Sequence, residues 1–192
     1  YGSAFRPADI APSGLNYLAL GHIHKTQMPL RAGKTWYGWP GVAMGRGFDE
    51  TGVHGVFSVT LTEDRDCAAE LLPLPGPRYY ELSAAAGDDP VAAAWAALAE
   101  VSQEDVVRLT LTGESPGVDL SQIRAALQGR CGSLVLVDET VPPQALWDEA
   151  GTGSLRGMAL SQLQGAFAAG DPDAAAAAKY LLAALEGRDA PW

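Results

Sequence analysis

Short apolar runs separated by turn residues make up the first part of the chain and predict a mostly β unit over residues 15–74. Alternation and β-branched or aromatic content favour strands at residues 15–20, 34–39, 56–61 and 67–74. Residues 9–14 are typical of a short helix leading into a turn. The segment from Gly41 to Gly55 holds five glycines and predicts a loop with unusual backbone angles or a close approach to another group.

A change of pattern follows the proline-rich segment at residues 73–77, which predicts a stiff connector and a domain boundary. Beyond it, strands alternate with helices, and the chain ends in a helical part, broken near Gly170, over residues 154–187. The alternating elements are a strand at 79–83, a helix at 88–101, a strand at 106–112, a helix at 119–128 and a strand at 134–137. This order predicts a small α+β unit with a sheet on one side and helices on the other.

Composition narrows the functional classes. No run of about 18 apolar residues occurs, so we expect no membrane span and a cytoplasmic location. Cys67 and Cys131 show neither a metal-binding spacing nor a disulfide framework. The net charge of −10 argues against a surface that coats nucleic acid. Residues 1–50 nevertheless carry five basic and three acidic residues, a balance of +2 that favours an anionic substrate in this part of the chain.

The stretch LALGHIHK at residues 18–25 holds two of the three histidines, one residue apart and behind Gly21. If the segment is extended, His22 and His24 point to the same side and can reach one metal ion or two neighbouring ions. Their place at the end of an apolar strand is where ligands bind in open α/β sheets. The acidic residues nearby, Asp9, Asp49 and Glu50, show no matching ligand spacing. The residues alone therefore predict half of a metal site at most, and two ordinary polar residues at a strand end remain the alternative.

Three segments of the chain together resemble a known family. They are the stretch ending in GHIHK, the Pro-Gly turn at Tyr37-Gly-Trp-Pro-Gly41, and the run GRGFDETGVHGV at residues 45–56. These segments resemble the C-terminal half of the catalytic domain of calcineurin-like metallophosphoesterases, and among these the DNA repair exonucleases of the SbcD-like nuclease subunit branch. The resemblance implies that His22 and His24 are metal ligands in a two-metal site, with manganese the expected metal, that hydrolyses phosphodiesters at DNA ends.

The resemblance also implies a domain organisation and a set of partners. Residues 1–76 would be the C-terminal portion of the metallophosphoesterase β-sandwich, residues 77–140 an α+β capping domain and residues 141–192 a helical tail. The intact protein would act on DNA and could bind a coiled-coil ATPase subunit. The family's other metal-ligand motifs and its catalytic histidine precede GHxH and are absent here, so we expect a C-terminal fragment that is inactive alone. An incomplete sandwich also predicts self-association between copies of the chain.

Two other readings of the chain stay open. The part after the connector could be a partner-binding module of such a nuclease, which its acidic balance favours. The protein could also be a phosphodiesterase for a small substrate. Among single residues, Arg46 could contact a phosphate or pair with Asp49 or Glu50. Bases could stack on Trp36, Tyr37 and Trp39. The simpler expectation is that two of these three aromatic residues lie in the core and one lies at the surface. His54 is expected to be a turn residue.

Overall fold

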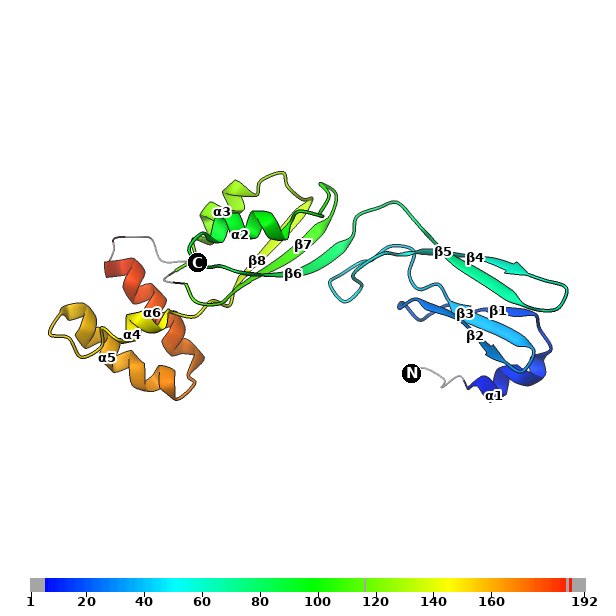
Figure 1. The fold of residues 1–192 in the computed structure, drawn as a ribbon, viewed down its shortest axis with the longest axis horizontal. Coiled ribbons are helices and arrows are strands. Elements are labelled where there is room, and N and C mark those ends of the chain that lie inside the picture. Colours follow the sequence, from blue (N-terminus) through cyan, green and yellow to red (C-terminus); the bar gives the residue numbers. More distant parts are fainter. Residues whose placement is uncertain (1–5, 116, 186, 188–192) are drawn as a thin grey trace. The chain divides into compact units, whose positions relative to one another are not determined.

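The computed structural model describes residues 6–115, 117–185 and 187, and it is a mixed α+β structure. The chain divides into two compact units, residues 1–80 and residues 81–192. The elements of both units are labelled in Figure 1, and each unit is described by itself below.

The first unit holds two small sheets. A short helix, α1 (Pro7–Ile10), and a 3₁₀ turn, η1 (Ala11–Ser13), lead into a three-stranded sheet of β1 (Tyr17–Ala19), β2 (Gln27–Ala32) and β3 (Thr35–Trp39). The strand order is β1-β3-β2, with β1 parallel and β2 antiparallel to β3. The strands β4 (Gly55–Leu61) and β5 (Cys67–Pro73) then form an antiparallel hairpin. The prediction of a mostly β unit over residues 15–74 is confirmed.

The strand β2 was missing from the sequence prediction. Its sequence, QMPLRA, includes a proline, which argues against a strand because proline lacks the backbone N–H that pairs with a neighbouring strand. The structure accommodates Pro29 on an edge strand, at a point where the register between β2 and β3 shifts by one residue. Gly38 of β3 lies against Pro29, because a Cβ at Gly38 would come within 3.1 Å of the Pro29 Cα.

The core of the first unit is small. Ile10, Ala32 and Tyr37 are buried, and partly buried Leu18, Leu20 and Trp39 pack against them. The fully buried Thr35 hydroxyl donates a hydrogen bond of 2.8 Å to the Leu15 carbonyl, which fixes the start of β1 against β3. Large apolar side chains that keep 39–50% of their surface exposed in this unit are Leu15, Ile23, Met28, Leu30, Met44, Val53, Val56, Leu61, Leu72 and Leu74.

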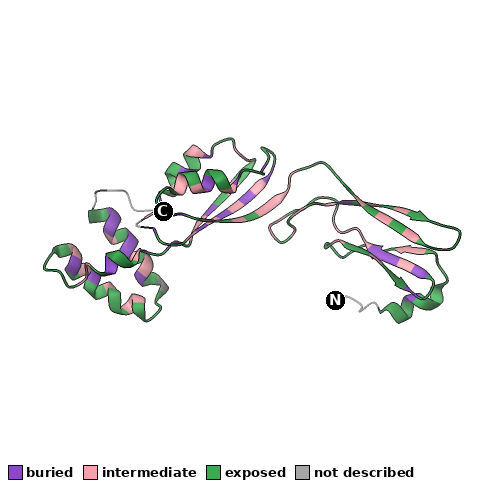
Figure 2. Ribbon diagram, viewed as in Figure 1, coloured by how far each residue is buried: buried purple, intermediate pink, exposed green. Residues whose placement is uncertain are grey.

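The second unit alternates strands and helices as predicted. Its sheet has the order β6-β7-β8, and β7 is parallel to β8. The helices α2 and α3 lie on the same face of this sheet (Figure 1). The elements run β6 (Tyr79–Ala85), α2 (Pro90–Ala97), β7 (Val106–Thr112), α3 (Leu120–Ala126) and β8 (Ser133–Asp138). Along β7, buried and less buried residues alternate (Figure 2), and Val107, Leu109 and Leu111 are fully buried.

Helix α2 begins where predicted but ends earlier. The Asp89 carboxylate caps its first turn by accepting a hydrogen bond from the Ala92 N–H. The predicted end at Val101 is wrong, since the helix stops at Ala97. The Arg130 guanidinium reaches the end of this helix and donates hydrogen bonds to the carbonyls of Leu98, Ala99 and Val101. A contact made from 29 or more residues away leaves no local sequence signal.

The helical part consists of α4 (Gln144–Trp147), α5 (Leu155–Ala168) and α6 (Pro172–Leu185). The single turn α4 was not predicted, because four residues are too few to show a helical period. The break between α5 and α6 lies at Gly170 as predicted, and the Asp171 carboxylate accepts a hydrogen bond from the Asp173 N–H. The helices share a core whose buried members are Leu146, Trp147, Leu160, Ala178 and Leu182.

A buried ion pair joins this helical part to the sheet. The Lys179 ammonium on α6 contacts the Asp138 carboxylate at the end of β8 at 2.9 Å, and donates a hydrogen bond of 2.8 Å to the Thr140 hydroxyl. The Thr140 hydroxyl in turn donates to the same carboxylate at 2.6 Å. The side chains of Lys179 and Asp138 are only 10% and 16% exposed, so water screens this ion pair poorly.

The partly buried Asp138 carboxyl is expected to make the stability of the second unit depend on pH. Burial raises its pKa, but hydrogen bonds from Thr140 and Lys179 outweigh burial, so its pKa lies below the usual range. As the pH falls, Asp138 is therefore protonated in the unfolded chain, where an aspartate has a pKa of about 3.9, before it is protonated in the folded chain. The contribution of Asp138 to the free energy of unfolding is complete above the unfolded pKa and is lost as the pH falls through the folded pKa.

The measurement compares the free energy of urea unfolding of the wild type and of Asp138→Asn at pH 6 and at pH 3. We expect the wild type to be the more stable protein at pH 6, and the difference between the two to narrow at pH 3. A difference in free energy of unfolding that stays constant between pH 6 and pH 3 would contradict a lowered pKa of Asp138 in the folded chain.

Within the described ranges, none of the helices combines the length and apolar character needed to cross a membrane.

Candidate functional site

The two histidines of GHIH follow directly on β1, at the carboxyl end of a parallel strand pair. Strand β1 ends at Ala19, and β3, its parallel neighbour, ends at Trp39. Because parallel strands end at the same edge of a sheet, the loop that carries His22 and His24 and the turn at Pro40–Gly41 emerge side by side. This edge is where ligands bind in open parallel sheets.

Hydrogen bonds lock these two loops together. The Val42 N–H donates to the His24 carbonyl at 3.0 Å, and the Thr26 hydroxyl donates to the Pro40 carbonyl at 2.9 Å. Gly41 makes the close approach possible: its φ is +84°, and a Cβ there would lie 2.6 Å from the His24 carbonyl oxygen. The predicted close approach in the glycine-rich loop is therefore found at Gly41, and it sets the backbone position of His24.

The backbone at His22 corrects one premise of the sequence argument. His22 has a φ of +74°, in the left-handed region, and residues 20–26 belong to no strand. The two histidines are therefore not on one side by strand alternation. The chain bends at the left-handed His22 instead, and within the described part of the chain no hydrogen bond or ion pair engages the exposed His22 ring.

His24 is held by a carboxylate that sequence spacing did not identify as its partner. Its Nδ1 lies 2.5 Å from Glu50 Oε1, and the Glu50 side chain is only 9% exposed. The Arg46 N–H donates to Glu50 Oε2 at 2.9 Å, and its guanidinium contacts Glu50 Oε1 and the His24 ring. Glu50 is 26 residues from His24, so only the fold of the glycine-rich loop brings them together. Asp9, the other acidic candidate, pairs with Arg6 on α1.

The charge state of Glu50 follows from its neighbours. Hydrogen bonds from Arg46 and then from His24 lower the pKa of the Glu50 carboxyl to about 2. The carboxyl is therefore ionised at neutral pH and accepts hydrogen bonds without donating any. An ionised carboxylate beside an imidazole is the arrangement that orients metal-binding histidines in proteins.

His54, the third histidine, lies just before β4 and braces the same loop. Its Nε2 donates a hydrogen bond of 2.9 Å to the Glu50 carbonyl. Its Nδ1 is buried and has no hydrogen-bond partner among the described residues. His54 lies in the loop directly before β4, where a turn residue was predicted, and it supports the backbone of Glu50.

These residues surround a cavity of about 420 Å³ in the first unit. Its walls come from the histidine loop and from the glycine-rich loop, and they are mostly polar. The lining residues are His24, Lys25, Thr26, Asp49, Glu50, Thr51, Val53 and His54. Within the described part of the chain, no three His, Cys, Asp or Glu side chains are grouped so that they could hold a metal ion.

The structure also shows where the other candidate residues lie. Arg46 does pair with Glu50, the ion-pair alternative for this residue. Tyr37 is buried and the partly buried Trp39 packs against the same core, whereas Trp36 is partly buried and lies outside that cluster. The indole N–H of Trp36 donates to the Arg65 carbonyl, and the Arg31 guanidinium lies 5.3 Å from the centre of its ring.

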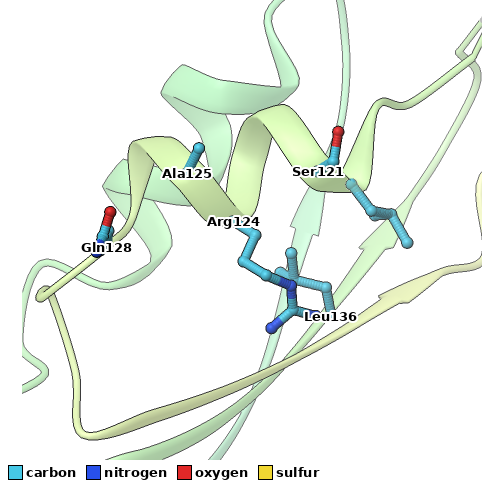
Figure 3. Close-up of a pocket in the computed structure, with 6 residues that line it drawn as sticks. Ser121, Arg124, Ala125, Gln128 and Leu136 are labelled. Carbon is cyan, nitrogen blue, oxygen red and sulfur yellow. The ribbon is translucent and has the colours of Figure 1, made fainter.

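A second, open cavity of about 610 Å³ lies in the second unit, between α3 and β8 (Figure 3). Its walls are formed by Leu120, Ser121, Arg124, Ala125, Gln128 and Leu136. The Arg124 side chain extends from the helix toward the strand, where its guanidinium donates a hydrogen bond of 3.0 Å to the Leu134 carbonyl. None of the residues singled out from the sequence lies here, so the candidate site is the one beside His24.

Comparison with known proteins assigns this site to no family: no protein-family model matches the chain, and no curated protein matches it significantly.

Proposed function

We propose that this chain contributes His22 and His24 to a two-metal centre that hydrolyses phosphodiesters, as the SbcD-like DNA repair exonucleases that it resembles do. The observation that carries the proposal is the placement of the GHIH loop. The loop leaves a parallel strand pair at its carboxyl edge and is fixed there by the bonds from Val42 to His24 and from Thr26 to Pro40. A rigid backbone at such an edge is what a metal or phosphate site requires.

Both side chains are of the residue type that binds metal ions. His24 contacts Glu50 through Nδ1, the Arg46 guanidinium lies 3.2 Å from its Nδ1 and 3.4 Å from its Nε2, and its side chain is 49% exposed. The imidazole of His22 is exposed and makes none of the hydrogen bonds that occupy His24 and His54. Imidazole nitrogens are the commonest metal ligands in proteins. The resemblance implies that His22 and His24 bind one ion each and that the metal is manganese.

Each part of the site then has a role. When bound, two metal ions would orient a water nucleophile and stabilise the charge that develops on the phosphate. His22 and His24 would fix the positions of the ions, and the ties to Val42 and Thr26 would keep the histidine backbone from moving. Lys25, beside His24 in the cavity wall, supplies positive charge for an anionic substrate. The other ligands of a complete centre do not lie among the described residues.

Manganese binding by the chain tests this proposal directly. We expect Mn²⁺ added to the ¹⁵N-labelled chain to broaden the ring resonances of His22 and His24 selectively, and the variants His22→Ala and His24→Ala to weaken that effect. Asp9→Asn serves as the control, because Asp9 lies on α1 and pairs with Arg6. Equal broadening in the wild type and in both histidine variants would contradict the proposal.

Activity separates the substrate classes. The chain alone, with Mn²⁺, is expected to leave an aryl phosphodiester intact. A longer translation product that contains this sequence together with the missing ligands is expected to degrade linear double-stranded DNA, and to lose that activity in His24→Ala. If such a product instead cleaved mononucleotide diesters faster than DNA ends, the small-substrate alternative would replace the exonuclease.

A further inference from the structure

The strand β8 is an edge of the sheet in the second unit, and one of its sides pairs with no other strand. The sheet order is β6-β7-β8, so β8 has β7 as its neighbour on one side only. Just past the end of β8, the Glu139 N–H donates to the carbonyl of Leu111 on β7 at 2.8 Å. Backbone groups alternate in direction along a strand, so the N–H and carbonyl groups of Leu134 and Leu136 point to the free edge.

The open cavity between α3 and β8 borders this free edge (Figure 3). Its lining residue Arg124 donates a hydrogen bond of 3.0 Å to the carbonyl of Leu134, one of the groups that β7 does not use. Leu120, Ala125 and Leu136 give the cavity apolar walls. The cavity thus combines an unpaired strand edge with a surface for side chains, which together are what an added peptide strand requires.

The charge of this cavity comes from Arg124. Among the described residues of the second unit, the basic side chains of Arg108, Arg156 and Lys179 pair with carboxylates, whereas Arg124 has a backbone carbonyl as its partner. The described lining residues of the cavity include no acidic side chain. A carboxylate group on a ligand would therefore complement the charge of the cavity.

We propose that the groove between α3 and the free edge of β8 binds an extended peptide, which adds a strand to the sheet and places a carboxylate side chain on Arg124. A peptide N–H replaces Arg124 at the Leu134 carbonyl, and a peptide carbonyl accepts from the Leu136 N–H. The released guanidinium then holds the carboxylate through two parallel hydrogen bonds. This proposal does not depend on the phosphodiesterase function proposed for the first unit.

A second copy of the chain is a less suitable occupant of this edge. Residues 81–192 carry sixteen acidic and six basic residues, so two such units brought together repel each other. A short peptide meets less of this repulsion, because exposed charges more than about 8 Å away are largely screened at physiological ionic strength.

The experiment selects random linear peptides displayed on phage against the full immobilised chain. We expect the enriched peptides to share one acidic residue within an alternating run of β-branched or aromatic residues. The strongest of them is then synthesised and added to the ¹⁵N-labelled chain. Without peptide, the N–H groups of Leu134 and Leu136 should exchange with solvent faster than those of Val135 and Val137, which face β7. With peptide, exchange at Leu134 and Leu136 should slow.

Variants test the role assigned to the guanidinium. Arg124→Ala is expected to weaken binding of the synthetic peptide by about 10-fold or more, the usual effect of losing a hydrogen bond to a charged group. Arg108→Ala is the matched control, because it removes an arginine of the same sheet that does not line the cavity, and its affinity should equal that of the wild type.

Each other outcome overturns the proposal. Selection that enriches no peptide, or a peptide that leaves exchange at Leu134 and Leu136 unchanged, removes the binding site. Equal binding to Arg124→Ala removes the carboxylate contact, and tighter binding shows that Arg124 shields the edge from strands. Slow exchange at Leu134 and Leu136 in the peptide-free chain shows a covered edge, and loss of that protection on dilution assigns the edge to a second copy.

Discussion

Replacing Lys179 by methionine is expected to cost the second unit about 3–5 kcal/mol of folding free energy, the range found when one partner of a buried ion pair is removed. The reason is the charge that remains. Asp138 is 16% exposed, and in the wild type its carboxylate contacts the Lys179 ammonium and the Thr140 hydroxyl. Methionine fills the volume of the lysine stem but offers no donor, so an ionised carboxylate is left partly buried beside apolar atoms.

Urea unfolding followed through NMR signals of the second unit measures this loss. Glu81→Gln is the control, because Glu81 and Arg108 form an exposed pair in the same unit, and such pairs contribute about 0–1 kcal/mol. The double variant Asp138→Leu, Lys179→Met removes both charges and is expected to recover part of the loss. A single Lys179→Met variant as stable as Glu81→Gln would show that the pair is solvated in solution.

Replacing Gly41 by alanine is expected to destabilise the first unit by about 2–4 kcal/mol, from left-handed strain and overpacking together. The φ of Gly41 is +84°, and the new Cβ would lie 2.6 Å from the His24 carbonyl oxygen and 2.9 Å from the Thr26 nitrogen. Both neighbours are backbone atoms that cannot turn aside. The histidine loop must therefore move, and the contact between His24 and Glu50 should weaken with it.

Gly52 offers a matched control within the same glycine-rich loop. Its φ is +91°, but a Cβ there meets nothing within 4 Å, so Gly52→Ala carries the backbone strain of about 1–2 kcal/mol without the collision. Urea unfolding of the first unit and the ring ¹⁵N pattern of His24 should separate the two variants. If Gly52→Ala disturbed the His24 ring as much as Gly41→Ala, the close approach at Gly41 would not be what positions the loop.

Local pattern was sufficient to predict much of the fold. The hairpin at β4 and β5 and the strands and helices from β6 to β8 follow alternation, caps and turn residues that lie within a few positions of each element. The errors arise where a contact between residues far apart in the sequence determines where an element forms or ends. The end of α2 depends on Arg130, and β2 exists because β3 pairs with it despite Pro29. Neither contact leaves a trace in the residues around it.

The candidate site shows the same limit. The sequence identified His22 and His24 as the residues of interest, but the alternation argument fails at His22, whose backbone is left-handed. It also could not choose Glu50 among the acidic residues nearby, since the partner of His24 is selected by how a loop of glycines folds back. The five glycines between Gly41 and Gly55 were the available signal, because they marked a segment where backbones approach closely.

The two edges of the β1-β3-β2 sheet differ in what they offer to a strand from another molecule. On β2, Pro29 lacks an N–H and the register shift interrupts the ladder, so this edge is a poor template for further pairing. On the other side, β1 is three residues long and ends shortly before the bend at the left-handed His22. An incoming strand would thus find one edge blocked and the other too short to extend past the histidines. Strand pairing between molecules is therefore disfavoured at both edges of this sheet.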